Sequence, residues 1–214
     1  MSDTATVLIC AYNEAPRVGA VVEAARGAAL GPVVVVDDGS SDETAAAAER
    51  FGARVVRHDV NRGKGAALAT GLEQVASPLT VLVDADLTGL TSHHIQQLVE
   101  PLDVNIPLAS RGVLIGGRWA TSVAQTLAPN LSGQRGFRTV DLRALGPFTE
   151  SGYGVEVLIE RGLKHLGIQQ TQVRLRGVGQ VMKEEKASFA GGARTRLQMY
   201  VEIGRQLLLR RRSG

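Results

Sequence analysis

The sequence predicts an α/β fold built on a mostly parallel sheet with helices on both faces. In roughly the first hundred residues, short apolar and β-branched runs alternate with longer stretches rich in Ala, Glu and Leu. Short β-branched runs are typical of buried strands, and the longer stretches have the composition of helices. Alternation of this kind implies crossover connections, which place successive strands in parallel. The expected strands are Thr6–Cys10, Val33–Asp37, Arg54–Arg57 and Leu79–Asp84.

The stretches between and after these runs are expected to be helices. Ser40-Ser41-Asp42-Glu43 fits a capping box, with Ser40 as the N-cap of the second helix. In parallel sheets of this type, ligands bind beyond the carboxyl ends of the strands, where the pairs Asp37-Asp38 and Asp84/Asp86 lie. The expected helices are Pro16–Ala28, Ser41–Phe51, Lys64–Ala76 and His93–Leu102.

The second half of the chain, from about residue 103, is less regular and richer in Pro, Gly and Arg. Helical stretches return at Tyr153–Leu166 and Arg194–Arg212, and Thr171–Arg176 alternates between polar and apolar residues. The sequence has no internal repeat and no low-complexity linker. We therefore expect a single domain over residues 1–214, in which the second half completes a pocket on the sheet.

Composition excludes several classes of protein. The chain has 214 residues, of which 44% are hydrophobic, and its formal net charge of +3 is too small to indicate nucleic-acid binding. No apolar run approaches the ~18 residues of a membrane span, and no signal peptide is visible at the N-terminus. The single cysteine, Cys10, lies in an apolar run and is expected to be a buried thiol. These features together predict a cytoplasmic globular protein.

Asp84 and Asp86 are candidate metal ligands at the end of an apolar strand. Two carboxylates so close repel each other, and a divalent cation removes the repulsion. Mg²⁺ typically takes one or two carboxylates together with phosphate oxygens and water. The alternative is a turn or cap role for Asp86 and a solvated strand end for Asp84. His93 and His94 are adjacent and do not share a helix face, which disfavours metal binding by the pair.

Two further motifs suit a nucleotide. Asp38, followed by a glycine turn, can bond a ribose hydroxyl or a base, as an acid does in dinucleotide folds; its alternative role is turn formation. Lys64 lies between glycines in Asn61-Arg-Gly-Lys-Gly at the start of a helix and suits a phosphate or ribose. This segment lacks the full phosphate-loop pattern, so a solvated surface lysine is the alternative.

Taken in order, these motifs closely resemble those of family 2 glycosyltransferases of the GT-A fold. They are Cys10-Ala-Tyr-Asn-Glu, Val35-Val-Asp-Asp-Gly-Ser-Ser-Asp-Glu-Thr, Asn61-Arg-Gly-Lys-Gly and Val83-Asp-Ala-Asp. The later Ser132-Gly-Gln-Arg-Gly-Phe-Arg and Gly152-Tyr-Gly-Val-Glu look like the dolichyl- or polyprenyl-phosphate sugar transferase branch. The resemblance covers about residues 5–190.

The resemblance implies a hexosyltransferase that inverts the anomeric centre and transfers a sugar from a UDP- or GDP-sugar with Mg²⁺ or Mn²⁺. It implies a nucleotide-binding half over about residues 1–102 and an acceptor half over about residues 103–192. Its functional residues fall on matching positions. Ala11, Tyr12, Asn13 and Glu14 border the nucleotide, Asp38 meets base or ribose, Asp84 and Asp86 hold metal and diphosphate, Arg118 and Arg135 meet phosphate groups, and Glu156 faces the acceptor. Among these, Asp86, Glu156 and Arg135 are the expected catalytic residues.

The acceptor is less defined by the sequence. A hydroxyl acceptor needs a base, whereas a phosphomonoester acceptor is already an anion and needs cations for positioning. Residues 103–192 contain more arginines and lysines than acids, which favours a phosphorylated acceptor such as a lipid phosphate. Solvated surface arginines are the alternative. The chain lacks the Gln-x-x-Arg-Trp motif of processive polysaccharide synthases, and Leu87-Thr-Gly-Leu replaces the polar and proline residues common after the metal motif.

Two rival functions remain open at this point. A nucleotidyltransferase on a related sheet usually opens with a glycine-rich basic loop, where this chain has Ala11-Tyr-Asn-Glu-Ala-Pro. A non-catalytic sugar-nucleotide-binding module would keep the donor site and lack acceptor chemistry.

The C-terminal residues 193–214 form a predicted amphipathic helix surrounded by arginines. Such a helix can lie on an anionic membrane, which would give peripheral contact with the inner membrane surface. Its alternative is packing on the domain or on a second subunit, as in a homodimer.

Overall fold

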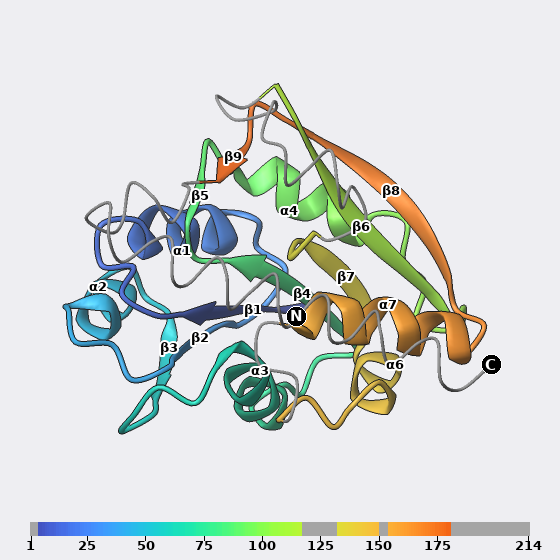
Figure 1. The fold of residues 1–214 in the computed structure, drawn as a ribbon. Helices are drawn as coiled ribbons and strands as arrows, with labels where there is room; N and C mark the ends of the chain where they lie inside the picture. Colours follow the sequence, from blue (N-terminus) through green and yellow to red (C-terminus); the bar gives the residue numbers. More distant parts are fainter. Residues whose placement is uncertain (1–3, 117–131, 150–153, 181–214) are drawn as a thin grey trace.

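The computed structural model describes residues 4–116, 132–149 and 154–180, and these residues contain a seven-stranded sheet with strand order β3-β2-β1-β4-β7-β6-β8 (Figure 1). A second sheet consists of the two short strands β5 and β9. The strands are β1 (Ala5–Ala11), β2 (Val33–Asp37), β3 (Arg54–Arg57), β4 (Leu79–Asp84), β5 (Leu87–Thr88), β6 (Leu108–Ile115), β7 (Arg135–Arg138), β8 (Gln169–Arg176) and β9 (Gly179–Gln180).

The large sheet is mostly parallel, as the sequence predicts. β1 pairs in parallel with both β2 and β4, and β2 pairs in parallel with β3. β7 runs antiparallel to both of its neighbours, β4 and β6, whereas β6 and β8 are parallel to each other. The carboxyl ends of β1, β2 and β4 therefore meet at one edge, where the acidic motifs lie.

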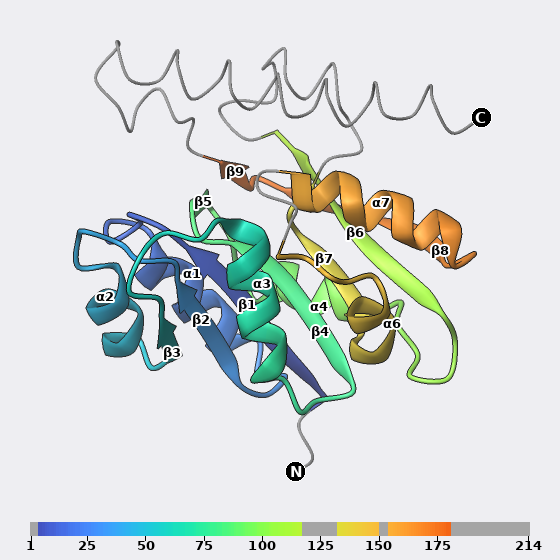
Figure 2. The ribbon, with the colours of Figure 1, turned by 60° about the horizontal axis from the view of Figure 1, so that its bottom comes forward.

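Helices cover both faces of this sheet, which confirms the predicted fold class (Figures 1 and 2). One face is packed by α1, α2 and α4, and the other by α3, α6 and α7. The helices are α1 (Val18–Gly27), α2 (Thr44–Arg50), α3 (Lys64–Glu73), α4 (Ser92–Val99), α6 (Thr139–Ala144) and α7 (Val155–His165).

Alternation along the strands divides the apolar residues between two cores. In β1, Val7 and Ile9 pack against α1 and α4, whereas Leu8 packs against α3 on the opposite face. Successive side chains of a strand point to opposite faces, so a strand that is covered on both sides becomes continuously apolar. This is why the central strands appear in the sequence as unbroken runs.

Two expectations about local structure need correction. The capping box at Ser40 is wrong: α2 begins at Thr44, and Ser40 Oγ accepts a hydrogen bond from Asn13 N at 2.9 Å instead. A capping box does occur at α4, between the Thr91 and His94 side chains and backbones.

The strands β6 and β7 were not expected from the sequence. Both carry polar or small residues at buried positions, such as Ser110 and Arg135.

None of the helices in the described ranges combines the length and the apolar character that crossing a bilayer requires. The predicted C-terminal helix over residues 193–214 lies outside the described residues. Arg118 also lies outside them.

Candidate active site

The loops after β1 and β2 are locked together by side-chain hydrogen bonds. Asn13 Oδ1 accepts a bond of 2.9 Å from Ser41 N, and Glu14 N donates one of 2.8 Å to Thr44 Oγ1. Asn13 adopts a positive φ of 54°, a conformation that asparagine tolerates better than most residues. The backbone over Ala11–Glu14, predicted to border the nucleotide, is thus held in one shape. Beside it, the Tyr12 side chain is exposed.

Asp38 organises the loop that precedes α3. Its Oδ1 accepts from Arg62 N at 2.9 Å and lies 2.7 Å from His58 Nδ1, and its Oδ2 accepts from Gly63 N at 2.7 Å. The neighbouring Gly39 has a φ of +72°, and a Cβ there would overlap the backbone of this same loop. Both oxygens of Asp38 therefore have protein partners, and its predicted contact with base or ribose stays a prediction.

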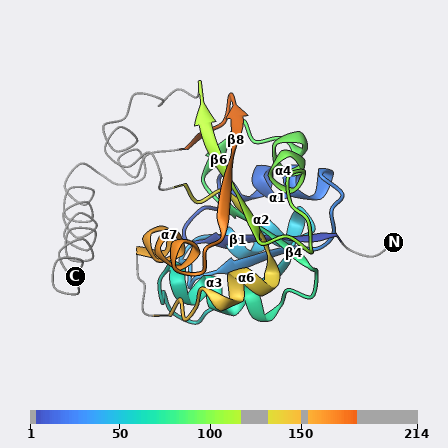
Figure 3. The same cartoon turned by 90° about the vertical axis from the view of Figure 1, so that its right-hand side faces the viewer.

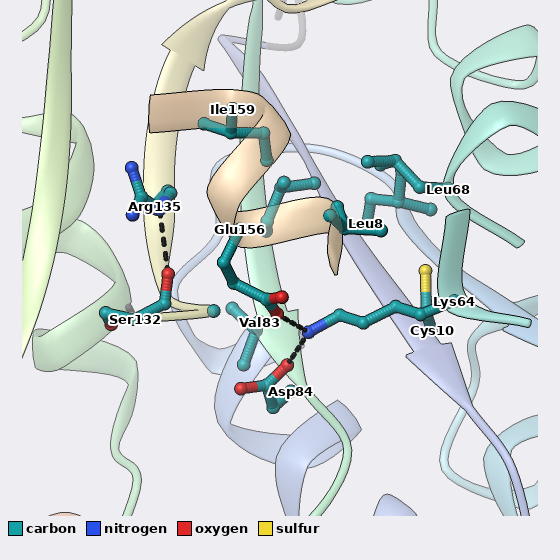
Figure 4. A pocket seen from close by; sticks show the side chains of 13 residues that line it. Leu8, Cys10, Lys64, Leu68, Val83, Asp84, Ser132, Arg135, Glu156 and Ile159 are labelled. Atoms are coloured by element: carbon teal, nitrogen blue, oxygen red, sulfur yellow. Dashed lines mark hydrogen bonds and ion pairs between the residues drawn. The ribbon is translucent and has the colours of Figure 1, made fainter. Parts of the chain in front are cut away.

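Lys64 brings together two of the acids that the sequence singles out. Its ammonium donates to Asp84 Oδ1 at 2.7 Å and to Glu156 Oε1 at 2.6 Å (Figure 4). Lys64 begins α3, Asp84 ends β4, and Glu156 lies in the first turn of α7. Burial lowers the pKa of Lys64, but attraction to Asp84 and Glu156 outweighs burial and leaves that pKa well above its ordinary value. The lysine is therefore a permanent cation between two carboxylates.

Asp84 and Asp86 face a common point. The Gln180 amide nitrogen lies 3.0 Å from Asp86 Oδ1 and 3.5 Å from Asp84 Oδ2. A second amide, that of Gln134, donates to Asp84 Oδ2 at 2.7 Å. Because β9 pairs with β5 just after the metal motif, Gln180 is held at this place by the backbone.

The geometry fits a hard divalent cation bound by few protein ligands. Two carboxylates that reach one amide hydrogen-bond donor can also reach one cation in that position, and oxygen ligands suit Mg²⁺ or Mn²⁺. Among the described residues, no group of three or more His, Cys, Asp or Glu side chains is placed to hold a metal. A cation held by Asp84 and Asp86 would have open positions for diphosphate oxygens and water.

A pocket opens next to Lys64 between the sheet, α3 and α7 (Figure 4). Its base is apolar, with Leu8, Leu68 and Ile159, and its polar end is formed by Lys64, Asp84 and Glu156. Burial raises the pKa of the Cys10 thiol in this wall to about 12, so the thiol stays protonated at neutral pH. Cys10 lies in the pocket wall and is half-buried, whereas the sequence predicted a fully buried thiol.

Arg135 lies on the far side of this pocket with a different set of partners. Its side chain is 1% exposed and bonds Glu160 Oε1 at 2.6 Å, Gln170 Oε1 at 3.1 Å and the Ser132 carbonyl at 2.7 Å. Burial lowers the pKa of Arg135, although the bond to Glu160 opposes this. Arg135 lines the same pocket as Glu156, whose negative charge raises the pKa of Arg135, and the predicted contact of Arg135 with phosphate remains untested.

The structure thus brings together Lys64, Asp84, Asp86 and Glu156, and keeps the Ala11–Glu14 loop at the same edge of the sheet. Sequence reasoning missed Gln134 and Gln180. Gln134 lies inside the Ser132-Gly-Gln-Arg motif, which was a usable signal, whereas nothing in the sequence marked Gln180. The Lys64 partners also differ from expectation, since they are carboxylates of the protein.

The chain is similar to proteins whose names refer to phosphate-bearing compounds. The chain is 38% identical over 109 residues to the undecaprenyl-phosphate 4-deoxy-4-formamido-L-arabinose transferase of Pseudomonas aeruginosa, covering 46% of this chain and 32% of that protein. It is 29% identical over 191 residues to the glucosyl-3-phosphoglycerate synthase of Mycolicibacterium paratuberculosis, covering 72% of this chain and 58% of that protein. The chain thus spans about a third to just over half of the length of these relatives.

Among solved structures, a similar one is glucosyl-3-phosphoglycerate synthase from Mycobacterium tuberculosis in complex with Mn²⁺, UDP and glucosyl-3-phosphoglycerate. It has a TM-score of 0.70 and 26% identity, over 92% of this chain and 80% of that one. Residues 6–147 match the profile of glycosyl transferase family 2, a range that contains the loops after β1 and β2, Lys64, and Asp84 and Asp86 at the end of β4. With the motifs, the sheet order and this match in agreement, the chain belongs to glycosyl transferase family 2.

Proposed function

We propose that this chain is a metal-dependent glycosyltransferase, which transfers a hexose from a UDP-sugar to a phosphate-bearing acceptor. The observation that carries the proposal is the convergence of Asp84 and Asp86 on one point, at the end of β4 in a family 2 chain. The similar mycobacterial enzyme holds Mn²⁺ and UDP, which supports Mn²⁺ or Mg²⁺ and a uridine donor here. Bound at Asp84 and Asp86, the metal would neutralise the charge that develops on the leaving diphosphate.

The residues of the chain would set up the rest of the reaction. The loop Ala11–Glu14, with the exposed Tyr12 beside it, would form one wall of the nucleotide site. Lys64 holds Asp84 in place through its ammonium, and the same ammonium fixes the Glu156 carboxylate at the mouth of the pocket. Glu156 is the proposed base for a hydroxyl acceptor, because its carboxylate lines the pocket in which an acceptor hydroxyl would come within hydrogen-bond reach.

The acceptor is proposed from the relatives. One is named for undecaprenyl phosphate and the other for 3-phosphoglycerate, so a phosphate group is common to both names. A free phosphate oxygen would attack the sugar directly, whereas phosphoglycerate offers a hydroxyl that must lose a proton. Incubation with UDP-glucose, Mn²⁺ and each acceptor in turn, with detection of the glycosylated product, decides between them. Nuclear magnetic resonance of the product reads the anomeric configuration, for which inversion is the prediction.

For a lipid acceptor, we further propose peripheral membrane contact through the arginines of residues 193–214. Co-sedimentation with anionic and neutral vesicles tests this by comparing the full chain with one that ends at Gly192. Salt-sensitive binding to anionic vesicles that disappears on truncation supports the contact. Equal recovery of both proteins in the supernatant excludes it.

The donor site is tested by Asp86→Ala. Asp86 lies in the turn after β4 and accepts from Gln180, so its loss should leave the sheet intact. Calorimetric titration with UDP-glucose should show that Mn²⁺-dependent binding is abolished, while Glu100→Ala, an exposed acid just beyond α4, retains it. Unchanged metal-dependent affinity in the Asp86 variant would contradict the proposed function. Donor binding without any product would leave a binding module as the better description.

A further inference from the structure

A second hollow, of about 490 Å³, lies between α4 and β8 at the outer end of the large sheet. Figure 3 shows α4 beside the paired strands β6 and β8. The hollow shares no lining residue with the pocket at Lys64 in the described part of the chain. Its described lining consists of His93, His94, Gln97, Gln172, Arg174 and Arg176.

The alternation of β8 explains why polar side chains gather here. Val173 and Leu175 pack against the hydrophobic core, whereas the alternate residues Gln172, Arg174 and Arg176 are exposed and line the hollow together with residues of α4. On α4, His93 and Gln97 are four residues apart and therefore share a face of the helix. Two elements that are distant in sequence thus direct hydrogen-bond donors into one space.

His94 joins the two walls of the hollow. Its Nδ1 accepts a bond of 3.2 Å from the backbone N–H of Thr91, which caps α4. Burial and the neighbouring His93 lower the pKa of His94, while a hydrogen bond with the backbone of Arg176 opposes them. The imidazole therefore interacts with both α4 and β8, the two elements that border the hollow.

The positive charge of this hollow is not balanced by its own lining. The lining residues described include no carboxylate, and neither Arg174 nor Arg176 forms an ion pair within the described ranges. By contrast, Arg135 and Arg138 each bond an acid directly. Two guanidinium groups on alternate residues of β8, together with the amide and imidazole groups of the described lining, give the hollow a surplus of hydrogen-bond donors and of positive charge.

We propose that this hollow binds a phosphate group, carried either by a small phosphorylated molecule or by a lipid headgroup. Guanidinium forks match phosphate oxygens in a bidentate manner, and the amides of Gln97 on α4 and Gln172 on β8 add neutral donors. The binding site is separate from the donor pocket, so the proposal does not depend on the proposed function.

The test uses the full chain in EDTA, so that no metal links phosphate to Asp84 and Asp86. Titration of ¹⁵N-labelled protein with inorganic phosphate at low salt should give saturable shifts at the amides of Gln97, Arg174 and Arg176. Arg174→Gln combined with Arg176→Gln should weaken phosphate binding by about tenfold or more, since charge-assisted hydrogen bonds are lost. Arg50→Gln combined with Lys164→Gln is the matched control, because it removes two exposed cations elsewhere.

A parallel experiment compares vesicles of phosphatidylglycerol with vesicles of phosphatidylcholine. Phosphate binding in solution identifies a small phosphorylated ligand. Binding only to phosphatidylglycerol vesicles, lost in the Arg174/Arg176 variant, identifies a lipid headgroup. The proposal is overturned if neither probe binds, if the control pair weakens binding equally, or if the phosphate shifts map to Lys64 and Asp84 instead.

Discussion

Lys64 and Glu156, which lie in the first turns of helices from opposite halves of the chain, are joined by a hydrogen bond of 2.6 Å between the ammonium and Oε1. The same ammonium bonds Asp84 at 2.7 Å. One lysine therefore connects the expected metal motif with the residue expected to face the acceptor. A substitution at Lys64 should therefore alter the surroundings of both Asp84 and Glu156.

Replacing Lys64 with Met should separate metal binding from nucleotide binding. Without the ammonium, the negative charge at Asp84 and Glu156 is less neutralised, so Mn²⁺ should bind the donor-free protein about tenfold more tightly. UDP should bind more weakly, because a cation near its phosphates is lost. Electron paramagnetic resonance of free Mn²⁺ and calorimetry with UDP measure the two affinities. Lys164→Met, at an exposed site on α7, should change neither; weaker Mn²⁺ binding in Lys64→Met would refute the prediction.

Glu156→Gln discriminates between a base and a positioning residue. If Glu156 takes a proton from a hydroxyl acceptor, kcat should fall by about 10²–10⁴. A change confined to the acceptor KM would indicate positioning, as expected for a phosphate acceptor. Steady-state kinetics against Glu73→Gln, the same exchange at an exposed site on α3, controls for the loss of charge. If both parameters stay at the wild-type values, Glu156 has no role in the mechanism.

Gly133 is expected to be intolerant of a methyl group for a reason local to the site. A Cβ there would overlap the Asp84 carboxylate, although the backbone of Gly133 has no positive φ that excludes alanine. Gly133→Ala should therefore displace Asp84 and lower activity by about 10²-fold, because small misplacements of catalytic groups are costly. The melting temperature should change little. In Gly27→Ala the new Cβ meets Ser92 at an ordinary 3.4 Å, so full activity is expected there; a normal rate in Gly133→Ala would show that Asp84 tolerates the shift.

The ion pair between Arg135 and Glu160 should make stability depend on pH. Burial raises the pKa of Glu160, but hydrogen bonds from Gln170 and Arg135 lower this pKa by more. The net pKa of Glu160 therefore lies below its ordinary value of 4.5. A depressed carboxyl pKa stabilises the fold above the unfolded value, and this stability is lost as pH falls through the folded value. Glu160→Gln should therefore lower the free energy of unfolding at neutral pH and reduce its decline below about pH 4.5.

Urea unfolding at several pH values measures this effect, with Glu73→Gln as the exposed control. Parallel curves for wild type and Glu160→Gln at every pH would show that Glu160 is not coupled to folding. An equal change in the control would attribute the effect to net charge.

The first half of the fold could be predicted because its signals are local. β1, β2 and β4 are short apolar runs, β3 is a short run with two β-branched residues at its centre, and each is followed by a helical stretch. β6 and β7 escaped prediction because their character depends on distant partners. Arg135 can occupy a buried strand position only because Glu160 on α7 neutralises it, and no local pattern contains that information.

The site shows the same division. Asp84, Asp86, Lys64 and Glu156 could be singled out from charge and motif, and the structure brings them to one end of the sheet. What each one touches could not be predicted. Ser40 bonds Asn13 in place of its own helix. The amides of Gln134, just before β7, and of Gln180, in β9, reach the aspartates from segments whose structure the sequence did not reveal.

The antiparallel strand β7 makes the two halves of this chain inseparable. It lies between β4 and β6, so one edge of β4 finds its hydrogen-bonding partner in a strand of the second half. A fragment that ends near residue 102 would present this apolar edge with unpaired backbone groups, which is a template for association with other chains. A chimaera that takes its acceptor half from a relative would therefore need a β7 that fits the β4 of the other half. A junction placed between the halves would cut through a sheet that both halves share.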